Sequence, residues 1–274
     1  MQTFSEYLTE QYPQYKFLLV LIGEQLGEFP EWRHFTKTNL IKLRKGLQEK
    51  VCSNSARTYT AVLKAIFSQV SDEGVIPCKD YESVLNIRKE ASTAVYLNER
   101  ELERLMKVKP RNEVERYVLY MFIIQAYVGC RVSDAMKITE SNISNKRLSY
   151  VSEKTKVEAV VPVKPIVVDM IRQLHTLKPV SEVTYCKVIK VLCMRAGITE
   201  QVTIFKGGKD ISKPKYMLVA THTARRSFAT NLYERGLDLY AIKQFMGHSQ
   251  TSMTERYICS GIRDIDDRIK SFFE

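Results

Sequence analysis

The stretch from Tyr117 to Cys130 carries no charged residue and constrains the fold of this 274-residue chain more than any other. It is shorter than the ~20 apolar residues that a membrane-spanning helix needs, so we predict a helix buried in a globular core. This helix is expected to begin at Glu113 and to end at Val128, because Gly129 suits the left-handed position that follows many helix C termini. A mainly α fold is therefore expected.

A change of pattern divides the chain before this helix. The stretch from Gly74 to Ala94 contains Pro77 and lacks a sustained helical period, which is typical of an interdomain passage. Residues 1–95, including this passage, are expected to form a helical domain. In that domain, apolar residues recur at helical spacing from Ser55 to Val70, with Ser55 as the N-cap.

Residues 96–274 are expected to form a second, mostly α domain with a small antiparallel β-sheet. A capping box formed by Asn98 and Glu101 marks its first helix. Two short strands, Leu148–Val151 and Glu158–Val163, flank a polar segment and predict a hairpin. Further helices are predicted over Pro165–Leu177 and Ser181–Ala196. Three more are predicted over Thr221–Arg235, Asp238–Met246 and Thr251–Tyr257, each with its first residue as the N-cap.

The charge of the chain favours a polyanionic partner. The net charge is +11 and the pI about 9.3, and phosphates bound by Lys and Arg release condensed counterions. Residues 1–95 hold 12 Lys+Arg against 11 Asp+Glu, a net of +1, which leaves a net of +10 for residues 96–274. The second domain is thus expected to face phosphates most heavily. From composition alone, a merely basic soluble protein is an equal alternative.

Several classes of protein are not favoured by the sequence. No segment matches a membrane span or a secretory signal, so a cytoplasmic location is expected. The six cysteines form no CxxC pair and have no histidine at finger spacing, so neither a disulfide framework nor a metal site is predicted. In the first domain, Arg57 and Lys64 share one helix face, which fits a DNA contact and an ordinary solvated face equally well.

The segment from Thr221 to Tyr257 carries the strongest functional signal, with the sequence THTARRSFATNLYERGLDLYAIKQFMGHSQTSMTERY. His222 and Arg225 stand at i and i+3, which places both on one helical face. His248 lies at a predicted helix end, and Tyr257 follows it by nine residues. Each feature is weak by itself, because lone histidines are commonly structural and the chain has 15 tyrosines.

The order of these residues is more specific than any one of them. In sequence order the set is Arg131 in GCRVSD, a hairpin lysine, His222, Arg225, His248 and Tyr257. This set resembles the active site of the tyrosine recombinases, or phage integrases. Residues 96–274 look like the family's catalytic domain and residues 1–95 like its helical core-binding domain. HTARRSFAT and FMGHSQTSMTERY are specific motifs, whereas the N-terminal match rests on helical pattern and position.

The resemblance implies cleavage of DNA through a covalent 3′-phosphotyrosyl bond to Tyr257, with neither metal nor nucleotide as cofactor. Arg131 and Arg225 would stabilise the phosphate charge, because a guanidinium fork matches two phosphate oxygens and stays charged at any working pH. A tyrosine is mostly protonated at neutral pH and needs help to lose its proton, for which His222 is the candidate base or relay. His248 would donate a hydrogen bond to the phosphate.

Three further roles follow from the same resemblance. Lys154, in the pattern SEKT, would be the general acid that protonates the leaving 5′-oxygen. Lys156 is the alternative, and the two lysines would point the same way along a straight strand unless a turn separates them. Asp134 resembles the acid that holds the first arginine in place. Arg226 lies about 100° round the helix from Arg225 and is expected to touch the DNA backbone or a neighbouring acid.

The family also implies partners. Its members assemble as a homotetramer on paired sites in double-stranded DNA, here from subunits expected to be monomeric in solution, and accessory DNA-bending proteins can take part. Integration or excision of a phage or mobile element would be the outcome. The apolar stripe in Ile258–Glu274 would dock on a neighbouring subunit or on its own domain. Two alternatives use the same sequence features: a type IB topoisomerase-like relaxation of DNA, and a DNA-binding protein without catalysis.

Overall fold

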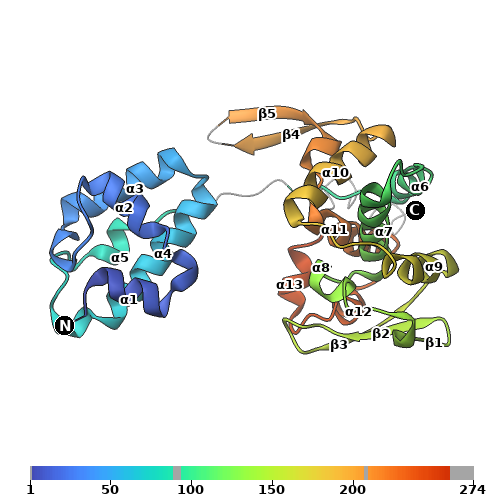
Figure 1. Cartoon of the computed structure of the whole chain (residues 1–274), viewed down its shortest axis with the longest axis horizontal. Coiled ribbons are helices and arrows are strands. Elements are labelled where there is room, and N and C mark those ends of the chain that lie inside the picture. Colours follow the sequence, from blue (N-terminus) through green and yellow to red (C-terminus); the bar gives the residue numbers. More distant parts are fainter. Residues whose placement is uncertain (1, 89–93, 207–208, 260–274) are drawn as a thin grey trace, which may run out of the picture. The chain divides into compact units, whose positions relative to one another are not determined.

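The computed structural model describes residues 2–88, 94–206 and 209–259, and the chain forms two compact units (Figure 1). The first unit comprises residues 1–92 together with Phe205–Lys209, and the second comprises Thr93–Ile204 and the chain from Asp210 onward. Both are mainly helical, and a small antiparallel sheet lies in the second, which confirms the predicted fold class. No helix among the described residues is both long and apolar enough to cross a membrane.

The first unit is a helical bundle with an apolar core. Its α-helices are α1 (Phe4–Gln11), α2 (Leu18–Leu26), α3 (Lys37–Lys50), α4 (Ser53–Gln69) and α5 (Tyr81–Val84). Short 3-10 turns cover Pro13–Tyr15, Trp32–His34 and Ser71–Glu73. The rings of Phe4, Phe35 and Phe67 are fully buried and pack in series at steep angles to one another, with centroids 4.7 and 4.9 Å apart, so aromatic burial provides much of this core.

Two sequence expectations for this unit need correction. Helix α4 begins at Ser53 with Cys52 in the N-cap position, three residues before the predicted N-cap Ser55, and the carbonyl of Cys52 accepts from the N–H of Ala56 at 3.0 Å. Much of the predicted interdomain passage also packs into the first core. Its residues Val84 and Leu85 are buried there, because the short helix α5 turns them inward, and apolar burial outweighs the weak local pattern.

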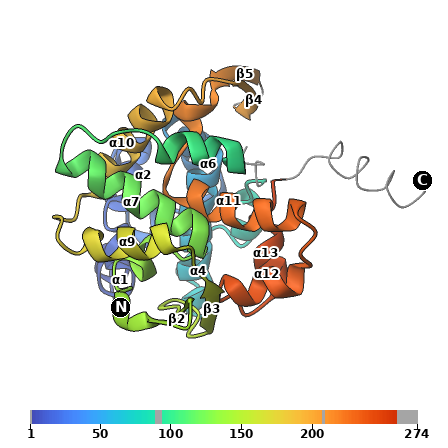
Figure 2. The same cartoon turned by 90° about the vertical axis from the view of Figure 1, so that its right-hand side faces the viewer.

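Helix α7 (Glu113–Val128) is the centre of the second unit, as the charge-free stretch predicts. It packs against α9 (Pro165–Leu174), α10 (Glu182–Arg195) and α11 (Thr221–Glu234), and Figure 2 shows it running between α9 and α11. The remaining helices of this unit are α6 (Glu99–Met106), α8 (Val132–Ala135), α12 (Leu239–Phe245) and α13 (Thr251–Glu255).

Gly129 ends α7 in the left-handed conformation, with φ of 75°, which confirms the predicted stop. A Cβ at this position would lie 2.4 Å from the ring of Phe228 on α11. Glycine is therefore required twice here, by the backbone angle and by the close approach of α11. The turn that follows leads directly to Arg131.

The predicted hairpin is present as two strands of a three-stranded antiparallel sheet. Strands β2 (Arg147–Val151) and β3 (Glu158–Pro162) pair with Leu148 opposite Val161 and Tyr150 opposite Ala159, and these four side chains face the core. The two-residue strand β1 (Ile143–Ser144) extends the sheet. A second, two-stranded sheet of β4 (Gln201–Lys206) and β5 (Lys209–Pro214) was not predicted, although the Gly207-Gly208 pair in the sequence is a hairpin signal.

Helix starts in the second unit follow the predicted caps in two of four cases. The capping box of Asn98 and Glu101 is present, and Asp238 accepts from the N–H of Ala241 at 2.9 Å. Thr221 and Thr251 are instead the first residues of their helices, after Ala220 and Gln250. Helix α11 therefore begins one residue earlier than expected, and the Thr223 hydroxyl accepts from the N–H of its N-cap residue Ala220 at 3.0 Å.

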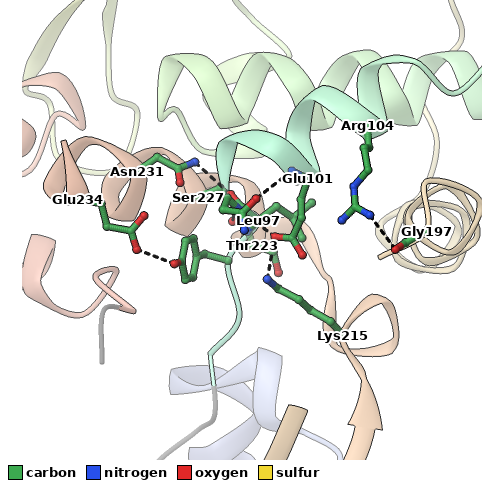
Figure 3. Close-up of polar contacts among 11 residues, drawn as sticks. Leu97, Glu101, Arg104, Gly197, Lys215, Thr223, Ser227, Asn231 and Glu234 are labelled. Carbon is green, nitrogen blue, oxygen red and sulfur yellow. Dashed lines mark hydrogen bonds and ion pairs between the residues drawn. The ribbon is translucent and has the colours of Figure 1, made fainter. Parts of the chain in front are cut away.

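The chain enters the second unit along the side of α11 (Figure 3). The N–H of Leu97 donates to the Ser227 hydroxyl at 2.8 Å, and the Asn231 amide donates to the carbonyl of Leu97 at 3.0 Å. The Tyr96 hydroxyl donates to Glu234 at 2.5 Å. The backbone N–H and carbonyl of Leu97 are thus each satisfied by a different residue of α11, and these bonds hold the incoming segment along the helix.

Candidate active site

A cavity of about 710 Å³ opens in the second unit. Its wall is formed by α7, α8, α10, α11, the hairpin turn and the segment after α13. Most residues that the sequence singled out line it, namely Arg131, Lys154, His222, Arg225, Arg226 and Tyr257. Arg256 and Glu182 lie in the same wall, so the cavity carries a large excess of positive charge and suits an anion.

Arg225 is held rigidly at the base of this cavity, with only 1% of its surface exposed. Its Nη1 donates to the carbonyl of Gly129, and its Nη2 donates to the carbonyl of Met246 at 2.7 Å. Both carbonyls lie at helix ends, where backbone acceptors lack helical partners. Burial is the main cause that lowers the pKa of Arg225, yet a guanidinium remains charged in any working buffer.

His248 lies behind Arg225 and is 1% exposed. Its Nε2 lies 2.6 Å from Nη2 of Arg225, and its Nδ1 lies 3.0 Å from the Thr254 hydroxyl. Burial, followed by the charges of Arg225 and Arg131, lowers the pKa of His248 to about 3. The imidazole is therefore neutral at physiological pH, and it contacts the buried arginine rather than the cavity wall.

Arg131 occupies the N-cap position of α8, and its Nη1 donates to the Ser152 hydroxyl at 2.6 Å. Asp134 lies 3.8 Å from the same nitrogen and is 4% exposed. The other oxygen of Asp134 accepts from the N–H of Glu153 at 3.0 Å. Asp134 and Ser152 thus connect Arg131 to the hairpin turn, so the arginine and the turn are positioned together.

The turn between β2 and β3 separates the two candidate lysines. The N–H of Lys156 donates to the carbonyl of Ser152 at 2.8 Å, and Lys156 has a left-handed φ of 56°. The chain therefore reverses around Lys154, which is exposed and lines the cavity, whereas Lys156 is not among the lining residues. The hydroxyl of Thr155 donates to the carbonyl of Gly247 at 2.7 Å and fixes the turn to the segment after α12.

His222 lies in the first turn of α11, exposed on the cavity wall, with its ring centroid 6.2 Å from that of Tyr257. Partial burial is the first cause that lowers its pKa, and the charges of Arg226 and Arg225 act in the same direction. His222 is consequently neutral near pH 7, with a free lone pair that can take up a proton.

Tyr257 lies two residues beyond the end of α13 and faces both histidines and the buried arginine. Its ring centroid is 5.4 Å from that of His248 and 5.4 Å from the guanidinium carbon of Arg225. Its backbone N–H donates to the carbonyl of Thr254 at 2.8 Å, and its carbonyl accepts from the Thr230 hydroxyl at 3.2 Å. The main chain of the tyrosine is thus attached to both α13 and α11.

Several residues that hold this site were not predicted. Ser152, Thr230 and Thr254 are buried hydroxyls that contact Arg131, Tyr257 and His248 respectively, and their residue types carried no signal. Gly247 has a φ of 60°, and a Cβ there would lie 3.3 Å from that of Ser152. The glycine of the Gly247-His248 pair could have indicated this turn, because a left-handed residue after α12 favours glycine.

The remaining candidates lie outside this cluster or at its edge. Arg226 lines the cavity, and its buried Nε has no hydrogen-bond partner among the described residues. Arg57 is exposed and Lys64 half-buried on α4 of the first unit. Within the described ranges, no three His, Cys, Asp or Glu side chains lie together as a metal site would require. The apolar stripe after Tyr257 lies almost wholly outside the described residues.

Comparison with known proteins points to one family. The model of the phage integrase family matches residues 95–261, which is more than half of the chain. Tyrosine recombinase XerC of Syntrophus aciditrophicus (strain SB) is 27% identical over 212 residues, which cover 72% of this chain and 66% of that protein. XerC of Rickettsia massiliae (strain Mtu5) is 25% identical over 50% of this chain and 45% of that protein. The chain thus matches less than two thirds of either relative.

Solved structures share the fold. A lambda integrase dimer bound to a COC′ core site aligns with a TM-score of 0.67 and 16% identity, covering 93% of this chain and 95% of that one. The Tn1549 transposon integrase in complex with a circular intermediate DNA aligns with a TM-score of 0.68 and 14% identity, covering 96% of each chain. At these identities the likeness establishes the fold of the chain and not its substrate.

Proposed function

Because this chain belongs to the phage integrase family, we propose that it is a site-specific recombinase that breaks and rejoins DNA through a covalent bond to Tyr257. The observation that carries this proposal is that Arg131, Lys154, His222 and Tyr257 line one cavity with the buried guanidinium of Arg225. This set contains a nucleophile, a base that can take its proton, an acid that can protonate the leaving oxygen, and two cations that can stabilise the charge on the phosphate.

In the proposed cleavage step, the Tyr257 hydroxyl oxygen attacks the scissile phosphorus and loses its proton to His222. The pKa of His222 is lowered by burial and by Arg226, so the neutral base is present at physiological pH. A bond forms between the tyrosine oxygen and phosphorus, and the bond from phosphorus to the 5′-oxygen breaks. Lys154 donates a proton to that oxygen, which would otherwise leave as a poor alkoxide.

Arg131 and Arg225 stabilise the charge that builds on the non-bridging phosphate oxygens. Both are held in place before DNA arrives, Arg225 by helix-end carbonyls and Arg131 by Ser152 and Asp134. Preorganised donors need no reorganisation in the transition state, and the loss of one such donor costs about 10²–10³ in rate. The phosphotyrosine conserves the free energy of the broken bond, so a second DNA end can attack it without ATP.

The direct test is capture of the covalent adduct. A suicide DNA substrate, nicked so that the cleaved end diffuses away, is incubated with the protein in excess EDTA and resolved on a denaturing gel. We expect a protein–DNA adduct with the wild type and none with Tyr257→Phe. An adduct with Tyr257→Phe, or a requirement for magnesium, would refute the proposal.

Lys154 is proposed as the general acid because it lines the cavity, whereas Lys156 does not. Replacement of the bridging 5′-oxygen by sulfur gives a leaving thiolate that needs no proton. Lys154→Ala should therefore be defective on normal DNA and regain cleavage on the sulfur substrate, while Arg225→Ala should stay defective on both. Rescue of Lys156→Ala, with Lys154→Ala active on normal DNA, would transfer the role to Lys156.

A second candidate function, relaxation of supercoils by a type IB topoisomerase mechanism, uses the same chemistry. Recombination is favoured because the family match includes XerC recombinases, and because a lambda integrase tetramer bound to a Holliday junction shares the fold. We propose double-stranded DNA as substrate, a homotetramer on paired sites, and action in the cytoplasm with accessory DNA-bending proteins. Relaxation by monomers without exchange between two sites would favour the topoisomerase.

A further inference from the structure

Glu182 differs from the other residues of the cavity wall, because it is the single acid among the lining residues in the part of the chain that the structure describes. It is the first residue of α10, and its side chain is exposed. Its carboxylate lies 3.5 Å from the hydroxyl of Thr221, the residue directly before His222. No step of the proposed mechanism so far uses this carboxylate.

A carboxylate at this place is unfavourable for the binding of DNA. The other charged side chains of the wall are all cations, namely Arg131, Lys154, Arg225, Arg226 and Arg256. They attract the phosphate of the substrate, whereas a carboxylate that faces the same cavity repels it and lowers the affinity for DNA. Glu182 therefore does not hold the DNA backbone, and its effect on a neighbouring group of the protein has to account for its place.

His222 is the neighbour on which Glu182 acts. Burial lowers the pKa of this histidine, and three positive charges act in the same direction, those of Arg226, Arg225 and Arg131. The charge of Glu182 acts in the opposite direction. A general base works best when its pKa is close to the working pH, so the arginines that bind the phosphate also make His222 a weaker acceptor for the proton of Tyr257. Glu182 offsets part of this loss.

We propose that Glu182 is a positioning residue that acts through His222: its carboxylate stabilises the imidazolium that forms when His222 takes the proton of Tyr257. The proton stays on His222, and Glu182 remains ionised throughout, as the aspartate of a serine protease triad does. Direct contact is not needed, because unit charges interact across several ångströms near a protein surface. The catalytic consequence rests on the proposed function, whereas the interaction between the two side chains does not.

The interaction can be measured without DNA. In the full-length protein labelled with 13C-histidine, NMR follows the ring resonances as the pH is changed, and those of His222 are assigned by their loss in His222→Ala. We expect the pKa of His222 to be lower in Glu182→Gln than in the wild type, because the imidazolium loses a nearby opposite charge. His175, which is not among the lining residues, should titrate identically in both proteins. An unchanged pKa of His222 would overturn the proposal.

The catalytic effect is measured by single-turnover cleavage of the suicide substrate from pH 5 to pH 8, at saturating protein. Cleavage needs the neutral form of His222, so the rate falls as the pH drops through the pKa of this group. In Glu182→Gln this fall should occur at lower pH than in the wild type. The rate on the plateau should decrease by about two- to fivefold, because one exposed charge pair is lost and the base is weaker. Affinity for a single DNA site should not decrease, since the removed charge repels phosphate.

Two further variants separate the charge of Glu182 from its shape and from the net charge of the protein. Glu182→Asp keeps the carboxylate and should retain a pH profile close to that of the wild type. Glu200→Gln removes an exposed acid that is not among the lining residues, and it should change neither the pH profile nor the pKa of His222. Equal behaviour of Glu182→Asp and Glu182→Gln, or an equal shift in Glu200→Gln, would overturn the proposal.

The two measurements also separate this inference from the proposed function. Absence of any cleavage by the wild type would reject the recombinase, whereas the titration would still establish or reject the interaction between Glu182 and His222. Cleavage by Glu182→Gln with the pH profile of the wild type would reject Glu182 as a positioning residue and leave the recombinase intact.

Discussion

Helix α11 has two polar faces that differ in how completely their hydrogen bonds are satisfied. On the face that binds the incoming chain, Ser227 and Asn231 pair with both backbone groups of Leu97 (Figure 3). On the face toward the cavity, the charged Arg225 is buried with Nε lacking a partner among the described residues, and His222 has a free lone pair. Satisfied groups hold a structure together, whereas buried donors without partners are costly and mark the place of a ligand.

The comparison predicts that substitutions on the two faces affect different properties, namely cleavage and the free energy of unfolding. A change of the exposed His222 on the cavity face should reduce cleavage and leave the free energy of unfolding nearly unchanged. A change of the buried Arg225, which holds two helix-end carbonyls, should reduce both. Changes on the opposite face should reduce that free energy and leave the chemistry of the folded molecules intact. Because both faces belong to the same helix, the opposite face also sets the position of the cavity face. A substitution there that displaces α11 would therefore reduce both the free energy of unfolding and the rate of cleavage.

The largest effect is expected for His222→Ala on the cavity face. Loss of a general base commonly costs 10²–10⁴-fold in rate, and we expect a fall of about that size in single-turnover cleavage. The side chain is exposed, so thermal unfolding should change little. His175→Ala is a suitable control, because His175 is an exposed histidine outside the cavity whose Nε2 lies 2.6 Å from the carbonyl of Ile138. Wild-type cleavage by His222→Ala would remove the base from the mechanism.

The next largest effect is expected for Lys215→Met, beside the entry segment. Nζ of Lys215 lies 2.8 Å from Glu101, with side-chain exposures of 10% and 5%. Removal of one partner leaves the other charge buried, which commonly costs about 3–5 kcal/mol, and denaturant unfolding should show a loss of that order. Glu101→Gln in the same chain retains an acceptor for the capping box and should recover much of the loss. No recovery in the double variant would show that the lysine acts through packing instead.

A smaller effect is expected for Ser227→Ala, which leaves the N–H of Leu97 without its acceptor. A buried donor without a partner costs about 1–3 kcal/mol, so the unfolding midpoint should fall while the cleavage rate of the folded protein is unchanged. Ser252→Ala, at an exposed serine on α13, should alter neither quantity. If Ser227→Ala slowed cleavage without destabilising the protein, the two faces would not be separable.

The smallest effect concerns the pH dependence of stability. The pKa of His248 is lowered to about 3 in the folded protein from 6.5, so the unfolded chain binds a proton that the folded one excludes between these values. The stabilisation from this group is complete above pH 6.5 and is lost as the pH falls toward 3, by at most about 1.4 kcal/mol per pH unit. His248→Gln should show a shallower loss than the wild type in urea unfolding from pH 7 to pH 5. Parallel curves would mean that His248 is not held neutral.

The sequence predicted the parts of the fold that depend on local pattern. The charge-free segment predicted α7, Gly129 predicted its end, and the alternation of apolar and polar residues predicted β2 and β3. Burial of a helix or of one strand face selects apolar residues in a pattern that is visible in the sequence. The caps at Asn98 and Asp238 were also correct. The sheet of β4 and β5 was missed although the Gly207-Gly208 pair is a local hairpin signal. The inward packing of α5 was missed because it depends on contacts with other helices of the first unit.

The residues of the candidate site likewise include some that the sequence could predict and some that it could not. The order of these residue types, through the family resemblance, selected Arg131, His222, Arg225 and Tyr257 and preferred Lys154 to Lys156, and the structure brings these five residues to one cavity. The hydroxyl groups of Ser152 and Thr254 could not be selected, because a serine or threonine is informative only when its partner is known. The turn that separates Lys154 from Lys156 likewise required coordinates, since alternation alone would place both lysines on one face.

Identification of the residue that becomes attached to DNA tests the central claim most directly. The adduct formed on the suicide substrate in EDTA is digested with protease and nuclease, and tandem mass spectrometry locates the nucleotide-bearing residue among the 15 tyrosines of the chain. We expect a single modified peptide, with a nucleotide joined through its 3′-phosphate to Tyr257 and a free 5′-hydroxyl on the released strand. Attachment to another residue, or through a 5′-phosphate, would contradict the account.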